Sequence, residues 1–280
     1  MNYLEKLYLN HYISNVVQNY RKRDGWKKYS GLFLDSINYL IHHLGREWDY
    51  LEAVEKDGNK YELGKEPGVL FYLPYVRTDY IQFLIVAKED FYEREMLDIL
   101  KKKYISHDAV ILDIGANIEN HTVFFAKKCN DKHIYAFEPI SETCQILLKN
   151  IELNSLEDIV SVYNFAVGNG RDHKAKIIKS DPTNIGGTHL SNDVNGNIEV
   201  KGLDELCFDH HIDFIKIDVE GFEIEVLRGA KQLMFRDAPT IFIEAFQKNY
   251  ESVKALLESC GYRQVEALPD SNYVFVSKIS

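Results

Sequence analysis

The sequence of 280 residues predicts an α/β protein whose main domain is a doubly wound, Rossmann-like sheet. From residue 103 onward, apolar runs of strand length alternate with helical patterns, as expected for parallel strands that helices cover on both faces. The last two expected strands are joined by residues 268–272, a connection too short for a helical crossover, so they must form an antiparallel hairpin. We therefore expect five parallel strands followed by a C-terminal hairpin.

The elements of this domain follow from the apolar runs and from the glycine and proline residues between them. Strands are expected over 110–114, 133–137, 160–164, 214–218, 240–244, 262–267 and 273–277. A glycine-rich insertion at about 168–201 interrupts the pattern. It predicts a β-hairpin with a mobile loop that covers a ligand site.

The first hundred residues have a different texture. Apolar residues recur at helical spacing over 4–44, whereas 69–73 and 81–86 are short runs typical of strands, and 89–102 is a further helical pattern. We expect an α+β accessory region over 1–102 and the Rossmann-like domain over 103–280.

Composition narrows the classes of function. The net charge of −10 disfavours binding to the phosphates of nucleic acid. The four cysteines have no metal-ligand spacing, and there is neither a signal peptide nor an apolar run of the roughly 18 residues that a membrane span needs. We expect a cytoplasmic protein without membrane insertion.

Two turns at the carboxyl ends of strands indicate a nucleotide-like ligand. Asp113 and Gly115 follow the first strand, where an open α/β sheet binds its ligand, and Asp113 is suited to bond a turn amide or a ligand ammonium group. Glu138 ends the next strand at the roughly 20-residue offset expected for a carboxylate that binds both hydroxyls of an adenosine ribose. Asn164 and Ala166, after the third strand, are expected to face the adenine.

Four carboxylates gather at the ends of the fourth and fifth strands. They are Asp218, Glu220, Glu223 and Glu244. Such crowding is costly unless a cation lies there, and a sulfonium group, a metal ion or an arginine would serve. As catalytic candidates we name Asp218, Glu220 and Glu244, together with His189 in the insertion, which is either a lid residue with a suitable base or an ordinary loop histidine.

Four segments together resemble the FkbM-type methyltransferase family: 113–117, 136–139, 215–223 and 226–230. The resemblance implies the class I methyltransferase fold, S-adenosylmethionine as cofactor, and O-methylation of a hydroxyl, often on a sugar, glycan or other natural product. The residues assigned to the cofactor are Asp113, Gly115, Asn117, Asn120, Thr122, Glu138, Asn164, Ala166 and Asp218.

One position departs from the family pattern. The family continues its first loop as Gly-Ala-Asn-x-Gly, whereas this chain has Glu119 in place of the second glycine, and a carboxylate there is expected to repel the methionine carboxylate unless it turns away or pairs with a cation. A catalytically impaired, ligand-binding member of the fold therefore stays open, as does, more remotely, an NAD-dependent oxidoreductase. We expect a small-molecule or glycan acceptor, no metal site and a possible homo-oligomer.

Overall fold

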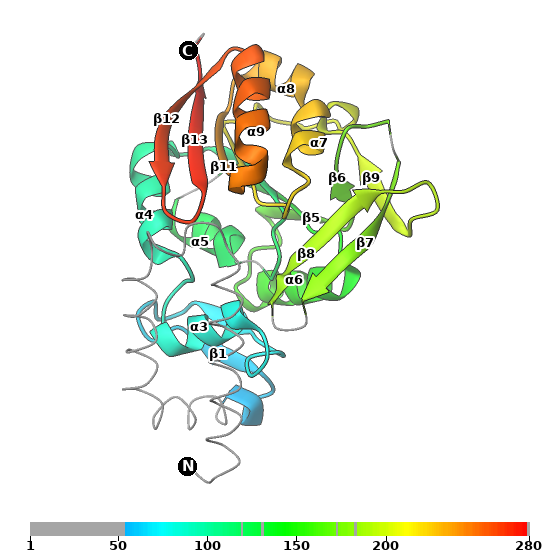
Figure 1. The fold of residues 1–280 in the computed structure, drawn as a ribbon. Helices are drawn as coiled ribbons and strands as arrows, with labels where there is room; N and C mark the ends of the chain where they lie inside the picture. Colours follow the sequence, from blue (N-terminus) through cyan, green and yellow to red (C-terminus); the bar gives the residue numbers. More distant parts are fainter. Residues whose placement is uncertain (1–53, 119, 130–131, 172, 182–183, 279–280) are drawn as a thin grey trace.

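A computed structural model describes residues 54–118, 120–129, 132–171, 173–181 and 184–278. Its centre is a seven-stranded sheet in the order β12-β13-β11-β10-β3-β4-β5 (Figure 1). Neighbouring strands among β11, β10, β3, β4 and β5 pair in parallel, whereas β13 pairs antiparallel with both β11 and β12. The predicted fold of five parallel strands with a C-terminal hairpin is confirmed.

The strands lie where the apolar runs predict them. They are β3 (Val110–Ile114), β4 (His133–Phe137), β5 (Val160–Tyr163), β10 (Phe214–Ile217), β11 (Thr240–Glu244), β12 (Tyr262–Leu268) and β13 (Asn272–Ser277). Because all five parallel strands run the same way, Gly115, Glu138, Asn164, Asp218 and Glu244 meet at one edge of the sheet, as their positions at the strand ends require.

Both faces of the sheet are covered, so the strands have no polar face. Ile111, Ile134 and Phe214 join one core cluster, whereas Leu112, Tyr135 and Ile215, one residue further along each strand, join the other. The first face is covered by α4 (Arg94–Lys103), α5 (Asn120–Lys128) and α6 (Ser141–Leu153). The second is covered by the 3-10 turn η1 (Leu203–Glu205), α7 (Glu223–Arg228), α8 (Lys231–Asp237) and α9 (Gln247–Ser259).

The described part of the accessory region contains β1 (Lys60–Glu62), β2 (Leu70–Tyr72) and α3 (Tyr80–Lys88), followed by α4. The strand predicted over 81–86 is wrong, because this segment lies inside α3. Asp79 caps the helix by accepting a hydrogen bond from the Gln82 amide, and residues 82–87 are buried on every side, so the segment shows no helical alternation.

The helix predicted over 89–102 begins later than expected, at Arg94. Glu89 and Glu93 both have left-handed backbone conformations (φ 54° and 59°), which end α3 and precede α4. The strand predicted over 69–73 is confirmed as β2. The helices predicted over 4–44, and Glu119, lie outside the described residues.

The insertion forms the predicted hairpin, from β7 (Lys174–Asp181) and β8 (Asn184–Asn192). These strands join β6 (Ala166–Val167) and β9 (Ile198–Lys201) in a second sheet of order β6-β9-β7-β8. In Figure 1 the hairpin projects from the body of the molecule on the side of α6 and α7. It packs on the main domain through Leu190, which contacts a small cluster that includes Phe222.

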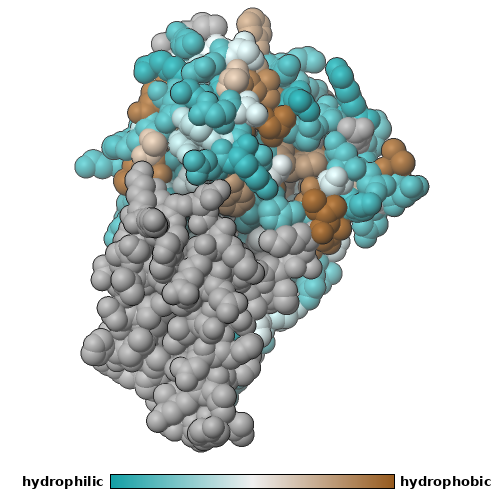
Figure 2. All heavy atoms as spheres, viewed as in Figure 1, coloured by the Kyte–Doolittle hydropathy of each residue, from teal (hydrophilic) through white to brown (hydrophobic). Residues whose placement is uncertain are grey.

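The surface in view is mostly hydrophilic, with apolar side chains in separate places (Figure 2). The hairpin contributes Ile177 and Ile178, 43% and 60% exposed. Among the described residues, no helix combines the length and the apolar character that crossing a membrane requires.

Candidate active site

The loop after β3 is fixed by its neighbours on both sides. Gly115 and Ala116 donate backbone hydrogen bonds to the carbonyl of Phe137, each at 3.0 Å. Gly115 has φ +78°, and a Cβ there would lie 1.8 Å from the carbonyl oxygen of Asp218. Only glycine therefore fits where this loop passes the end of β10.

Glu138 lies directly beside this loop. Its Oε2 accepts a hydrogen bond from the Asn117 amide at 3.1 Å, and its Oε1 accepts one from the Ile140 amide at 2.8 Å. Burial raises the pKa of Glu138 to about 7, although the two amides oppose the shift. The side chain of Asn164 supports this turn, since its amide donates to the Glu138 carbonyl at 2.8 Å.

Lys216 lies beneath the same loop and is 2% exposed. Its Nζ donates to the Gly115 carbonyl at 2.6 Å and lies 3.1 Å from Oδ1 of Asp113 and 3.6 Å from Oδ2 of Asp218. Burial alone would lower the pKa of Lys216, but the two carboxylates outweigh it and the pKa is raised. The lysine therefore stays charged and ties the ends of β3 and β10 together.

Asp113 and Thr122 are predicted to contact a cofactor, and their side chains lie beneath the loop. Both side chains are 0% exposed, and Thr122 Oγ1 donates to Asp113 Oδ2 at 2.7 Å. Among the described residues, Lys216 and Thr122 are the partners of the Asp113 side chain. Both residues support the loop from below.

Asn120, also predicted to contact a cofactor, is linked to the segment before α4. Its amide donates to the Tyr92 carbonyl at 2.7 Å and its Oδ1 accepts from the Tyr92 amide at 2.8 Å. Asn150 of α6 makes a second link of this kind, since it accepts from the Tyr72 amide and donates to the Ile118 carbonyl at 2.9 Å. The loop is thus fastened to the accessory region at two points.

The carboxylates at the ends of β10 and β11 form one cluster. Glu244 makes a side-chain hydrogen bond with Asp218, and burial, followed by the charges of Asp218, Glu220 and Glu93, raises the pKa of Glu244 well above its usual range. The burial and the neighbouring carboxylates therefore both favour the protonated form of Glu244, which is hydrogen-bonded to Asp218.

Glu223 has a different function from the other acids. It is 1% exposed and accepts hydrogen bonds from the Gly221 amide at 2.6 Å and from Asn249 Nδ2 at 3.2 Å. Burial raises its pKa. Glu223 holds the loop that carries Glu220, whose backbone is left-handed (φ 50°).

The hairpin brings His189 to this edge. A Cβ placed on Gly221 would lie 3.6 Å from Nδ1 of His189, so the histidine lies over the loop after β10. Ala166 is buried in the small cluster with Phe222, against which the partly buried Ile140 and Val219 also pack.

Sequence reasoning named Lys216 only as part of a motif and gave it no function. The available signal was a lysine within the buried strand 214–217, because a charge on such a strand requires a partner at the same depth. Among the described residues, no group of three or more His, Cys, Asp or Glu could hold a metal ion.

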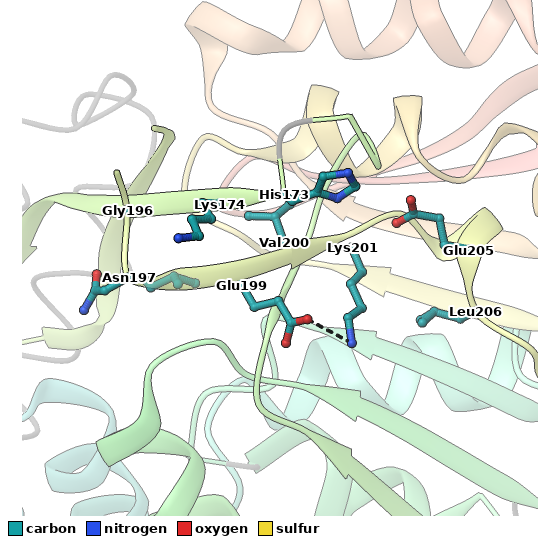
Figure 3. A pocket seen from close by; sticks show the side chains of 10 residues that line it. His173, Lys174, Gly196, Asn197, Glu199, Val200, Lys201, Glu205 and Leu206 are labelled. Atoms are coloured by element: carbon teal, nitrogen blue, oxygen red, sulfur yellow. Dashed lines mark ion pairs between the residues drawn. The ribbon is translucent and has the colours of Figure 1, made fainter. Parts of the chain in front are cut away.

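A separate open pocket of about 740 Å³ lies away from this edge, along β9 and the start of β7 (Figure 3). Its lining includes His173, Lys174 and the ion pair between Glu199 and Lys201, whose atoms are 3.1 Å apart. It contains none of the predicted site residues, so it is not part of the candidate active site.

The strand order, the hairpin and the loop beside Glu138 define a Rossmann-like fold of the methyltransferase type. Residues 113–264 match the model of the methyltransferase FkbM domain, and the chain belongs to this family.

Similar proteins carry related names. Methyltransferase 1 of Beauveria bassiana is 25% identical over 188 residues, which cover 58% of this chain and 76% of that protein. Hexuronic acid methyltransferase AglP of Haloferax volcanii is 29% identical over 144 residues, covering 49% of this chain and 56% of that protein. A crystal structure of a methyltransferase FkbM from Methylobacillus flagellatus aligns with a TM-score of 0.46 at 18% identity, over 72% of this chain and 53% of that one.

Proposed function

We propose that this protein is an S-adenosylmethionine-dependent O-methyltransferase that acts on a hydroxyl of a sugar, glycan or related natural product. One observation carries the proposal: Glu138, Gly115 and the pair of Asp218 with Glu244 meet at one edge of a methyltransferase-type sheet. A carboxylate for a ribose, a close-approach loop and a proton acceptor are then adjacent.

The residues present fit this cofactor. Each oxygen of Glu138 accepts one backbone amide and retains a further lone pair for the ribose hydroxyls. Oδ1 of Asn117 is buried in the loop without a hydrogen-bond partner among the described residues, which suits a ligand donor.

The cofactor, when bound, supplies the methyl group and the positive charge that makes it transferable. The protein must orient the acceptor hydroxyl and remove its proton as the new oxygen–carbon bond forms. Asp218 is the proposed base, because it follows β10 at the same edge as Glu138 and is hydrogen-bonded to Glu244, whose carboxyl group favours its protonated form. Its side chain is 32% exposed, so a substrate hydroxyl has access to it.

The acceptor class rests on two supports. Carboxylate oxygens at Asp218 and Glu220 are acceptors for the hydroxyl groups of a sugar. The relative from Haloferax volcanii is named for a hexuronic acid, which is a sugar. His189, which lies over the loop after β10, is the proposed lid residue above the acceptor.

The test separates cofactor binding from proton removal. Asp218→Asn is expected to bind S-adenosylhomocysteine within a few-fold of the wild type while methyl transfer to a panel of sugar and glycan hydroxyls falls roughly 10²- to 10⁴-fold. Asp158→Asn, at an exposed position before β5, is the control. Unchanged turnover by Asp218→Asn would refute the base, and a wild type that fails to bind S-adenosylhomocysteine in calorimetry would overturn the cofactor assignment.

A further inference from the structure

We propose that Glu93, from the accessory region, binds the α-ammonium group of the cofactor and completes the cofactor site from outside the Rossmann-like sheet. This inference rests on the proposed function, because it takes S-adenosylmethionine as the ligand. Glu93 lies before residue 113, where the match to the family domain begins. Four observations carry it: the backbone of Glu93, its contact with His121, the way its segment is fixed, and the charges around it.

The backbone of Glu93 is held in a conformation that a non-glycine residue seldom adopts. It has φ 59° and precedes α4, where its carbonyl accepts from the Leu97 amide at 3.1 Å. Its side chain does not cap the helix, although a side chain at this position ordinarily does. The carboxylate therefore does not serve as the helix cap, and strained backbone of this kind is typical of functional sites.

The carboxylate of Glu93 contacts the helix that follows the loop after β3. Its Oε2 lies 3.2 Å from Nε2 of His121, in the first turn of α5 directly after the cofactor loop. The Glu93 side chain is 22% exposed, whereas that of His121 is 10% exposed. The glutamate is therefore the member of the pair that a ligand can reach.

The position of Glu93 is fixed by its neighbours on both sides. The preceding residue, Tyr92, makes the two backbone hydrogen bonds with Asn120. The following residue, Arg94, forms an ion pair with Asp90 at 3.1 Å and packs over the ring of Phe124 at 5.6 Å. Because α5 supplies Asn120, His121 and Phe124, Glu93 has a defined place relative to the cofactor loop.

Charges link Glu93 to the strand ends. The negative charge of Glu93 contributes to raising the pKa of both Lys216 and Glu244, so its carboxylate is near the ends of β10 and β11. In the sheet order, β10 and β11 lie on one side of β3 and β4 lies on the other. Glu93 and Glu138 therefore stand on opposite sides of the Gly115 loop.

This arrangement gives the cofactor a direction. A ligand whose ribose bonds Glu138 and which crosses the Gly115 loop places its amino-acid end toward β10, on the side of Glu93. Asp218 and Glu244 are hydrogen-bonded to each other there, and Lys216 is occupied beneath the loop. Glu93 is partly exposed on this side, and its described partner is His121. Its carboxylate is therefore suited to a charge-assisted hydrogen bond with an ammonium group of the ligand.

The test compares two ligands rather than activity. S-adenosylhomocysteine and its deamino analogue, which has hydrogen in place of the α-ammonium group, are titrated calorimetrically into the full chain. The wild type is expected to prefer S-adenosylhomocysteine by roughly 10- to 100-fold, the range for one charged hydrogen bond. Glu93→Gln should abolish the preference by weakening S-adenosylhomocysteine alone.

Two variants keep the result interpretable. Glu95→Gln, exposed on the same helix, should retain the wild-type preference, and Glu93→Asp should retain part of it. A preference that survives in Glu93→Gln, or equal weakening of both ligands, overturns the proposal. A wild type that binds neither ligand overturns the proposed function itself, whereas binding of both ligands without preference overturns only the assignment of Glu93.

Discussion

Replacing Lys216 with methionine tests directly what holds the loop after β3, which carries Gly115. The variant keeps the length of the side chain but removes the cation that lies 3.1 Å from Asp113. Asp113 is 0% exposed, so its carboxylate would retain only the hydroxyl of Thr122 as a partner. Breaking a buried pair in this way costs about 3–5 kcal/mol.

The expected loss is large enough for a thermal melt. At roughly 2–4 °C per kcal/mol for a domain of this size, the melting temperature should fall by roughly 6–20 °C. Lys101→Met removes an exposed lysine from α4 and should change stability by no more than about 0.5 kcal/mol.

A second substitution decides whether the pair is the cause. The double variant Lys216→Met with Asp113→Asn removes both charges, and the new amide oxygen at position 113 can still accept the hydrogen bond from the Thr122 hydroxyl. At least half of the lost stability should therefore return. Affinity for S-adenosylhomocysteine should stay low in the double variant, because the Gly115 carbonyl has still lost its 2.6 Å hydrogen bond. If the two substitutions destabilise additively, the buried ion pair does not hold this loop and the reasoning fails.

Two further predictions concern cofactor binding. The pKa of Glu138 is raised to about 7, and the ribose hydroxyls require its ionised form. Affinity for S-adenosylhomocysteine should therefore fall about tenfold from pH 8 to pH 6, and Glu138→Gln should remove this pH dependence. A wild-type affinity that does not change with pH would contradict this prediction. Gly115→Ala should abolish the binding of S-adenosylhomocysteine in calorimetry, since the new Cβ would lie 1.8 Å from the Asp218 carbonyl oxygen. The control Gly261→Ala has φ +85° but open space around it, so it should show only the conformational cost of a left-handed backbone. Equal effects of the two substitutions on binding would exclude the clash as the cause.

The sheet was predictable because its strands are buried on both faces. Runs such as 110–114 and 214–217 have no other stable environment in a chain of this composition, and the short connection at 268–272 forces the hairpin. The same continuous burial explains the error over 81–86. A helix covered on all sides gives no alternation, and Asp79 was the one local signal for its start.

The site was predictable to the level of strand ends and no further. Glu138, Asp218 and Glu244 lie where the strands end, so topology alone brings them together. Asp113 lies inside β3, and Asn120 and Thr122 lie in the first turn of α5; their side chains turn inward, which only the packing reveals. The proposed role of Glu93 was not predictable, because its contact with His121 depends on how α4 packs beside α5.

Asn150 has a consequence for protein engineering. One amide in α6 holds the backbone of β2 and the backbone of the cofactor loop at the same time, and Asn154 repeats the grip on β2 one turn later through Leu70. In a chimera that exchanges only the first hundred residues between family members, the Asn150 amide would face a β2 strand from another protein. Grafts designed to change acceptor preference should therefore exchange β2, α6 and the loop as a matched set.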